Sequence, residues 1–215
     1  MRMKYIGMPM GMWTLFGKSF ERNLLTEFGL DRDTAKAVAA KAKPRYKEII
    51  AGLPEFEKGD HFKMNIAGCA LLAAFVLNMP ERPDVRRLTA YYSDSMMTPA
   101  MKWFCRKSGK SKFTKKDISS MKATERLRAA DRNPYSWNMV FYPYPDGSGY
   151  EARFTACGIC TQMRELQLYD LVPAMCRLDY TKAQAGGTSD FVREYTLASG
   201  GPYCDCGYKK KRKGR

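Results

Sequence analysis

Apolar residues in the first part of the chain recur at intervals of three and four, which is the period of an amphipathic helix. Over 12–28 this spacing predicts a helix that ends before Gly29, because glycine commonly terminates helices. A second helix is predicted from Asp31 to Leu53, with a break or kink at Pro44. The pattern therefore predicts a helical N-terminal part.

The most apolar segment of the chain, 62–79, has hardly any polar face. This composition predicts a buried helix, and the segment is too short and too interrupted to cross a bilayer, which takes about 20 residues. A further helix is predicted up to the segment that Pro99 disturbs. Thr114 and Asp117 then have the spacing of a capping box, which predicts another helix that ends near residue 131.

In the last third of the chain the period of the pattern changes from helical to alternating. Residues 137–142 and 150–156 are predicted to be the strands of a hairpin, because the intervening Pro-Asp-Gly-Ser-Gly favours a turn. Tyr150, Ala152 and Phe154 share one face of the second strand, as in a sheet that is covered on one side. Two helical segments, 159–168 and 172–182, and two strands, 190–197 and 203–208, complete the pattern.

These elements predict an α+β protein in which an N-terminal helical bundle packs on a C-terminal antiparallel sheet with crossing helices. We expect a single compact domain over 1–208, because the sequence contains no linker that would separate two domains. Within it, 12–132 is mainly helical and 135–208 holds the sheet and most of the cysteines. Residues 209–215 are predicted to be a disordered basic tail.

The net charge of +15 resembles that of nucleic-acid-binding proteins, but it is unevenly distributed along the chain. Residues 106–116 contribute +6 and the last seven residues another +6, so two short segments carry most of the excess. Blocks of like charge are usually solvated. Because no pattern of a known nucleic-acid-binding module accompanies them, we expect no specific nucleic-acid partner.

The start of the chain shows no apolar region followed by a cleavage site of small residues, so the sequence predicts no secretory signal and a cytoplasmic location. Cysteines in that compartment are expected to be reduced thiols or metal ligands, and a disulfide framework is not expected. We also expect no membrane partner, and the sequence leaves the oligomeric state open.

Five of the seven cysteines fall within fifty residues near the C-terminus, each at the end of a predicted element. A thiolate at the start of a helix is stabilised by the backbone N–H groups and by the helix dipole, which lower its pKa. Function is therefore expected in this region. The five residues are Cys157, Cys160, Cys176, Cys204 and Cys206.

The order of these motifs resembles that of the L-2-amino-thiazoline-4-carboxylic acid hydrolase family, most strongly over 135–208. The resemblance rests on a strand that ends in Cys157, on Cys176-Arg-Leu-Asp179-Tyr180, and on a final Cys204-Asp205. The chain departs from the family pattern at two places, because Gly158 stands where the family commonly has proline and Cys206 where it has phenylalanine.

The resemblance implies hydrolysis of a cyclic isothiourea that carries a carboxylate. A nucleophile adds to the ring carbon between sulfur and nitrogen, the bond from carbon to sulfur breaks, and an N-carbamoyl cysteine is released. Asp179 would orient water or pass protons, and an arginine would bind the carboxylate. The candidate catalytic residues are Cys157, Cys176, Asp179 and Cys204, and the candidate substrate-binding residues are Arg153, Arg177 and Arg193.

Several alternatives stay open at this stage. The cysteines could be small buried packing residues, and His61, the single histidine, is expected to start a helix and not to act as a base. No cofactor is expected for a hydrolase of this type. The competing hypothesis is a non-catalytic module that binds a small ligand, zinc or an iron-sulfur cluster. Its four thiolates would be Cys157, Cys160, Cys204 and Cys206.

Overall fold

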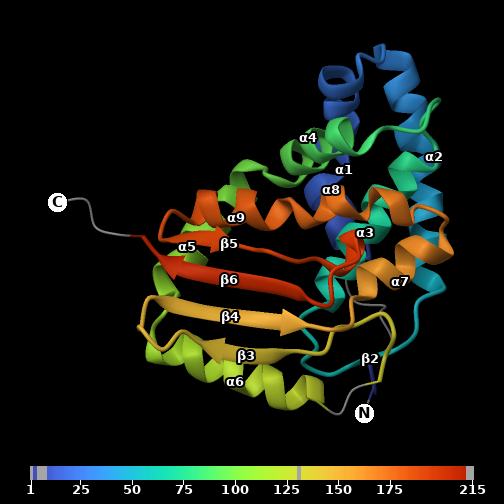
Figure 1. The fold of residues 1–215 in the computed structure, drawn as a ribbon. Coiled ribbons are helices and arrows are strands. Elements are labelled where there is room, and N and C mark those ends of the chain that lie inside the picture. Colours follow the sequence, from blue (N-terminus) through green and yellow to red (C-terminus); the bar gives the residue numbers. More distant parts are fainter. Residues whose placement is uncertain (1, 4–8, 130–131, 212–215) are drawn as a thin grey trace.

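A four-stranded antiparallel sheet and the helices that cover one of its faces form the frame of the molecule, and this arrangement confirms the predicted α+β class (Figure 1). The strand order is β3–β4–β6–β5, and every neighbouring pair is antiparallel. The strands are β3 (Val140–Pro143), β4 (Gly149–Phe154), β5 (Ser189–Val192) and β6 (Cys204–Lys210). The computed structural model describes residues 2–3, 9–129 and 132–211.

The central strands β4 and β6 present one apolar face to the helices, as the alternation in β4 predicted. The inward residues of β4 are buried, whereas Glu151 and Arg153 between them are partly exposed. The facing residues of β6 include two cysteines, so this register brings sulfur onto the covered face of the sheet. The cross-strand pairs on that face are Tyr150 with Tyr208, Ala152 with Cys206, and Phe154 with Cys204.

The N-terminal helices pack around α3, which is the centre of the bundle. Residues 66–76 of α3 are buried without exception, as the apolar segment predicted. Helix α2 continues through Pro44, where the sequence predicted a break or kink, and Asp31 caps its first turn. No helix in the described part of the chain is long and apolar enough to span a membrane. The four helices are α1 (Pro9–Phe28), α2 (Arg32–Ala51), α3 (Lys63–Val76) and α4 (Val85–Met96).

Helix α5 (Pro99–Ser111) is not among the elements predicted from the sequence, where Pro99 indicates a disturbance and not a helix start. Proline is well suited to the first turn of a helix, where its missing N–H has no acceptor to satisfy, and Thr98 caps the turn by accepting the N–H of Met101. Helix α6 (Lys115–Ala129) follows with the predicted capping bond from the N–H of Asp117 to the hydroxyl of Thr114.

Of the helices of the C-terminal half, α9 (Leu178–Gly186) runs alongside the edge strand β5, and α8 (Val172–Cys176) and α7 (Gly158–Glu165) lie toward the right of the view (Figure 1). The predicted helix over 172–182 is divided at Arg177, so Cys176 and Asp179 belong to two successive helices. Two short 3-10 turns accompany these helices, η1 (Tyr169–Leu171) and η2 (Leu197–Ser199). A separate ribbon pairs β1 (Arg2–Met3) with β2 (Phe56–Glu57).

The basic tail was predicted to begin at residue 209, but strand β6 extends to Lys210. Lys209 and Lys210 belong to β6, where they pair with Gly149 and Ser189 in the neighbouring strands. The side chain of Lys210 also donates to a carbonyl in the β3–β4 turn. The last part of the predicted tail, 212–215, lies outside the described residues.

Candidate functional site

A cavity of about 440 Å³ lies between the covered face of the sheet and helices α3, α4, α8 and α9. Such a volume suits a small molecule. Sulfur, carboxylate and cationic groups from distant parts of the sequence line it together, among them the candidate residues Cys157, Cys176, Asp179, Arg193 and Cys204.

Cys157 is the residue immediately before α7, and its thiol has a lowered pKa. The thiol of Cys160 makes the largest contribution by hydrogen bonding to the Cys157 sulfur. The N–H groups at the start of α7 and the indole N–H of Trp137 lower the pKa further, whereas burial opposes them. The pKa of Cys160 is raised by the same bond. The pair therefore holds its proton on Cys160 and favours a thiolate on Cys157.

Gly158 allows this geometry, because its Cα packs directly against the backbone of the segment before β3. A Cβ at this position would lie 2.1 Å from the carbonyl oxygen of Tyr135. Gly158, which stands where the resembling family commonly has proline, is thus the first residue of α7 and makes a close backbone contact there.

Cys176 and Cys204 lie on the same cavity but in environments that favour neutral thiols. Burial raises the pKa of Cys176 to about 12 and also raises that of Cys204, although the latter sulfur accepts the N–H of Leu197 at 3.1 Å. Cys206 also lines the cavity, and burial raises its pKa. Among these four cavity-lining cysteines, Cys157 is thus the thiol with a lowered pKa.

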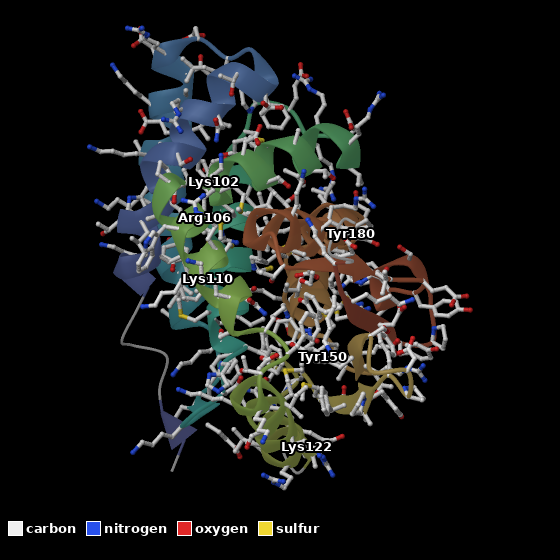
Figure 2. The ribbon with its side chains drawn as sticks, turned by 90° about the vertical axis from the view of Figure 1, so that its left-hand side faces the viewer. Lys102, Arg106, Lys110, Lys122, Tyr150 and Tyr180 are labelled. Atoms are coloured by element: carbon white, nitrogen blue, oxygen red, sulfur yellow. The ribbon has the colours of Figure 1, made fainter. Side chains whose placement is uncertain are left out.

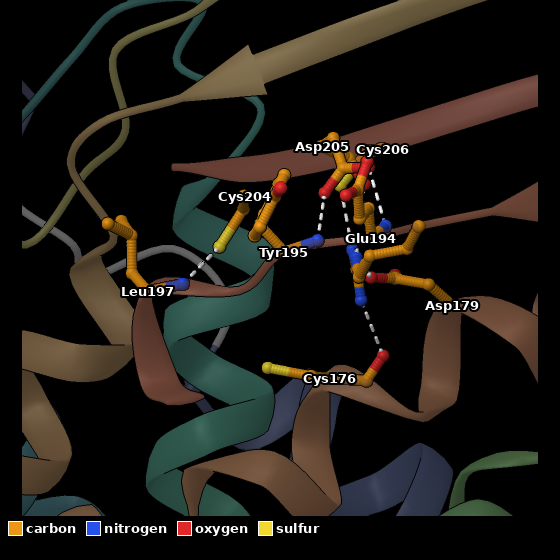
Figure 3. Close-up of polar contacts among 9 residues, drawn as sticks. Cys176, Asp179, Glu194, Tyr195, Leu197, Cys204, Asp205 and Cys206 are labelled. Atoms are coloured by element: carbon orange, nitrogen blue, oxygen red, sulfur yellow. Dashed lines mark hydrogen bonds and ion pairs between the residues drawn. The ribbon is translucent and has the colours of Figure 1, made fainter. Parts of the chain in front are cut away.

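Arg193 connects β5 to α8, α9 and β6 through four hydrogen bonds, several of which are drawn in Figure 3. Its guanidinium donates to the Asp179 carboxylate at 2.8 Å, the Cys206 sulfur at 2.7 Å, and the carbonyls of Cys176 at 2.9 Å and Asp205 at 3.2 Å. An arginine has five N–H donors, so most of its capacity is used within the protein. This arrangement suits a residue that positions Asp179 and Cys176.

Asp205 fixes the segment that follows Arg193. Its two carboxylate oxygens accept the N–H groups of Glu194 and Tyr195, each at 2.6 Å (Figure 3). Its neighbours in β6 point to the cavity. Asp205 itself is buried, at 8% exposure, and its carboxylate accepts its hydrogen bonds from backbone N–H groups. Its role is therefore structural.

Two of the three arginines that were predicted to bind the substrate lie outside this cavity. Arg153 is on the uncovered face of the sheet, where its guanidinium lies 4.7 Å from the ring centroids of both Tyr142 and Tyr203 and pairs with Glu151. Arg177 lines a separate hollow of about 220 Å³ and stacks on Tyr180. Neither is among the described residues that line the 440 Å³ cavity.

Lys112 is the cationic residue that the sequence analysis missed, because it was grouped with the solvated basic block. Its ammonium lies 3.2 Å from the centroid of the Tyr208 ring and donates to the Tyr150 hydroxyl at 3.2 Å. That hydroxyl in turn donates to Asp117 at 2.8 Å. Burial lowers the pKa of Lys112 to about 8 against the opposing charge of Asp117. Phe113 next to it has a φ of +64°, so a tight turn between α5 and α6 directs Lys112 inward.

Lys182 and His61 also line the cavity, from α9 and from the turn before α3. His61 does precede a helix, as predicted, but it reaches the cavity as well. The turn that carries it is held by Asp60, which accepts the N–H of Phe62 at 2.8 Å and pairs with Arg128 at 3.2 Å in the interior.

The alternative four-thiolate site receives no support from the positions of its members. In the residues that the structure describes, no three His, Cys, Asp or Glu side chains are grouped so that they could hold a metal ion. Cys160 is also absent from the described lining of the cavity that Cys157, Cys204 and Cys206 share.

Comparison with known proteins assigns the family. The sequence model of the L-2-amino-thiazoline-4-carboxylic acid hydrolase family matches residues 69–208, which include Cys157, Cys176, Asp179 and Cys204. No curated protein and no solved structure matches the chain significantly. Because the family model covers well over half of the sequence, the chain belongs to the L-2-amino-thiazoline-4-carboxylic acid hydrolase family.

Proposed function

We propose that this protein is a hydrolase that opens the ring of a small thiazoline carboxylate, with Cys157 as the nucleophile. The observation that carries the proposal is that a thiol of lowered pKa, a carboxylate and two lysines line one and the same cavity. Family membership gives the reaction class. Fold and family alone would not identify the reacting residue.

In the first step, the Cys157 thiolate adds to the ring carbon between sulfur and nitrogen. The bond from that carbon to the ring sulfur then breaks, and the departing sulfur takes a proton from a neighbouring acid. In the second step, water adds to the same carbon and expels the Cys157 thiolate. The net reaction consumes one water molecule and yields an N-carbamoyl cysteine with a free thiol.

Lys112 and Lys182 replace the predicted arginines as the groups that bind the substrate carboxylate. Both line the cavity, and the ammonium of Lys112 is held in place by the rings of Tyr150 and Tyr208. Cation and carboxylate attract strongly where water is scarce. Lys112 also has a pKa near neutrality, so it is a suitable acid for the departing sulfur.

Asp179 is the candidate base for the second step. Its side chain is 36% exposed, so water can reach it, and the bond from Arg193 fixes the carboxylate. Arg193 is a positioning residue in this scheme, as are the cap of Asp205 on the β5 segment and the thiol of Cys160 beside Cys157.

The test is to incubate the purified protein with L-2-amino-thiazoline-4-carboxylate and to follow the release of thiol together with the mass of the N-carbamoyl product. Cys157→Ala and Cys157→Ser are expected to lose about 10³-fold or more in kcat, because a covalent step is removed. Cys105→Ala is the matched control, since this cysteine lies on α5 outside the 440 Å³ cavity.

Full rate in Cys157→Ala would exclude Cys157 as the nucleophile. Binding of the substrate by the wild-type protein without any turnover would contradict the hydrolase proposal and favour the binding module.

A further inference from the structure

A second and larger cavity, of about 520 Å³, adjoins the candidate site. It lies between α1, α5 and α9 and shares six lining residues with the first cavity, so the two spaces are separated by one set of side chains. These shared residues are Met64, Asn65, Met96, Lys112, Lys182 and Tyr208.

The second cavity differs from the first in chemistry. Away from the shared boundary its walls are mainly apolar, from Met12, Phe16, Met101, Phe104 and Ala183 among others. Methionine side chains are flexible and polarizable, so a wall that contains several of them adapts to apolar groups of different shape. The cavity contains none of the clustered thiols of the candidate site, since Cys105 is its cysteine among the described residues.

The charged part of the second cavity lies at its boundary with the first. Lys112 and Lys182 line both cavities, so a carboxylate bound between them would have the reactive thiol on one side and the apolar space on the other. A ligand that uses the whole space is therefore an anionic amphiphile, with its carboxylate at the two lysines and an apolar group beyond them.

We propose that the preferred substrate of the site is a 2-amino-thiazoline-4-carboxylate that carries an apolar substituent on ring carbon 5, and that the 520 Å³ cavity binds this substituent. Carbon 5 is bonded to the carbon that bears the carboxylate, so both groups leave the ring from the same edge. The inference rests on the proposed function and adds the substrate class. The bonds that form and break are those of the unsubstituted ring, and the product is a 3-substituted N-carbamoyl cysteine.

Helix α5, which lines the second cavity, also carries exposed apolar and basic side chains. Helix α5 exposes Trp103 and Phe104, each at 58%, and Phe104 lines the cavity. Lys102, Arg106 and Lys110 follow one another along the same helix (Figure 2). A ligand that is both anionic and apolar is therefore attracted by the basic side chains of α5 and retained by the apolar walls of the cavity.

The first experiment measures binding and needs no turnover. Butanoate, hexanoate and octanoate are titrated into the wild-type protein in a calorimeter, and the affinity is expected to rise about fourfold for each added methylene, which corresponds to ~0.8 kcal/mol. Ala100→Trp, which enlarges an exposed residue at the rim of the second cavity alone, is expected to abolish this dependence on chain length. Ala40→Trp, at an exposed position of α2 away from both cavities, is the control and is expected to behave as wild type.

The second experiment compares kcat/KM for the unsubstituted ring and its 5-butyl derivative. We expect the wild-type protein to favour the 5-butyl compound by about tenfold or more, and Ala100→Trp to remove this preference without changing the rate on the unsubstituted ring. Equal rates on both compounds, or alkanoate affinities that do not depend on chain length, would overturn the inference. Chain-length-dependent binding without turnover of either ring would instead refute the proposed function and leave the apolar subsite in place.

Discussion

The burial of Lys112 in the cavity wall gives this side chain a lowered pKa that its position in a basic segment of the sequence does not predict. The nearby lysines Lys110, Lys115 and Lys116 are exposed, whereas the ammonium of Lys112 lies against two tyrosine rings in the cavity wall. Burial lowers its pKa to about 8. Because the amine must be protonated to bind a carboxylate or to donate a proton, its contribution is present below that pH and is lost as the pH rises through it.

The pH profile of kcat/KM is therefore expected to fall on the alkaline side of about pH 8. Lys112→Arg is expected to move this fall upward, since arginine stays protonated, while Lys112→Met is expected to lower the rate about 10²-fold at every pH. The measurement is a set of initial rates from pH 5 to pH 10 for the three proteins. Lys115→Met, at an exposed position of α6 that lines neither cavity, serves as the control, and an unchanged alkaline limb in Lys112→Arg would exclude Lys112.

Arg193 acts through the groups it holds. In Arg193→Lys the charge remains, but one ammonium cannot reach the Asp179 carboxylate, the Cys206 sulfur and two carbonyls together. We expect a loss of about 2 kcal/mol in the free energy of unfolding and a larger proportional loss in kcat than in KM. Urea unfolding and steady-state kinetics provide the two measurements. A large rise in KM with unchanged kcat would show that Arg193 binds the substrate directly.

Sequence patterns predicted which residue types belong to the site better than which individual residues form it. Asp179 and the candidate cysteines Cys157, Cys176 and Cys204 follow from motifs close together in the chain, and all four line the cavity. All three arginines carry a charge that suits a carboxylate, and the sequence alone does not show which of them reaches the cavity, although the alternation over 150–156 puts Arg153 on the face opposite Tyr150, Ala152 and Phe154. The sheet register places Arg153 on the open face, and the turn at Phe113 brings Lys112 inside.

At the level of elements, the start of α7 carries the Cys160 thiol and the backbone donors that lower the pKa of the Cys157 thiol. Gly158→Ala would place a methyl group 2.1 Å from the carbonyl oxygen of Tyr135, so the first turn of α7 must move. We expect a loss of about 1–3 kcal/mol in stability and a rise in the pKa of the Cys157 thiol, because its backbone donors are displaced. Thiol alkylation by iodoacetamide as a function of pH measures this pKa.

Gly52→Ala is the matched control for this variant. Gly52 caps α2 with a φ of −79°, and an added Cβ would meet its nearest neighbours at an ordinary 3.6 Å. It should leave both the alkylation profile and the unfolding midpoint nearly unchanged. A Gly158→Ala protein with the same Cys157 pKa as the wild type would show that the helix start does not tune this thiol.

Proline accounts for two differences between the predicted and observed elements. Pro44 lies inside α2, where packing of the surrounding residues on the bundle core outweighs the lost hydrogen bond, and Pro99 begins α5 instead of ending a segment. The local sequence cannot distinguish these cases, because the balance depends on tertiary contacts. Missing α5 also meant missing the second cavity, which this helix helps to enclose.

Across the whole molecule, a buried ion pair joins the N-terminal bundle to the segment that leads into the sheet. Asp60, before α3, pairs with Arg128 on α6 and accepts the hydroxyl of Ser136 at 2.6 Å, while Arg128 donates to the carbonyl of Trp137 at 2.8 Å. Both charged side chains are almost completely buried, at 0% and 1% exposure. The pair thus fixes the two segments that carry His61 and Trp137 to the cavity wall.

Asp60→Asn keeps the shape of the side chain but leaves the buried guanidinium without its counter-charge, so we expect a loss of about 3–5 kcal/mol in the free energy of unfolding. Glu48→Gln, which breaks the exposed Arg45–Glu48 pair on α2, is the control and should change stability by less than about 0.5 kcal/mol. In the double variant Asp60→Asn, Arg128→Met neither side chain is charged, so no buried charge is left without a partner. Its loss in the free energy of unfolding, measured in urea, should therefore be smaller than the sum of the losses in the two single variants. Strict additivity would mean that the two side chains stabilise the fold independently, and the turn at His61 would then owe its position to Phe62 packing on Trp137 and Phe154 instead.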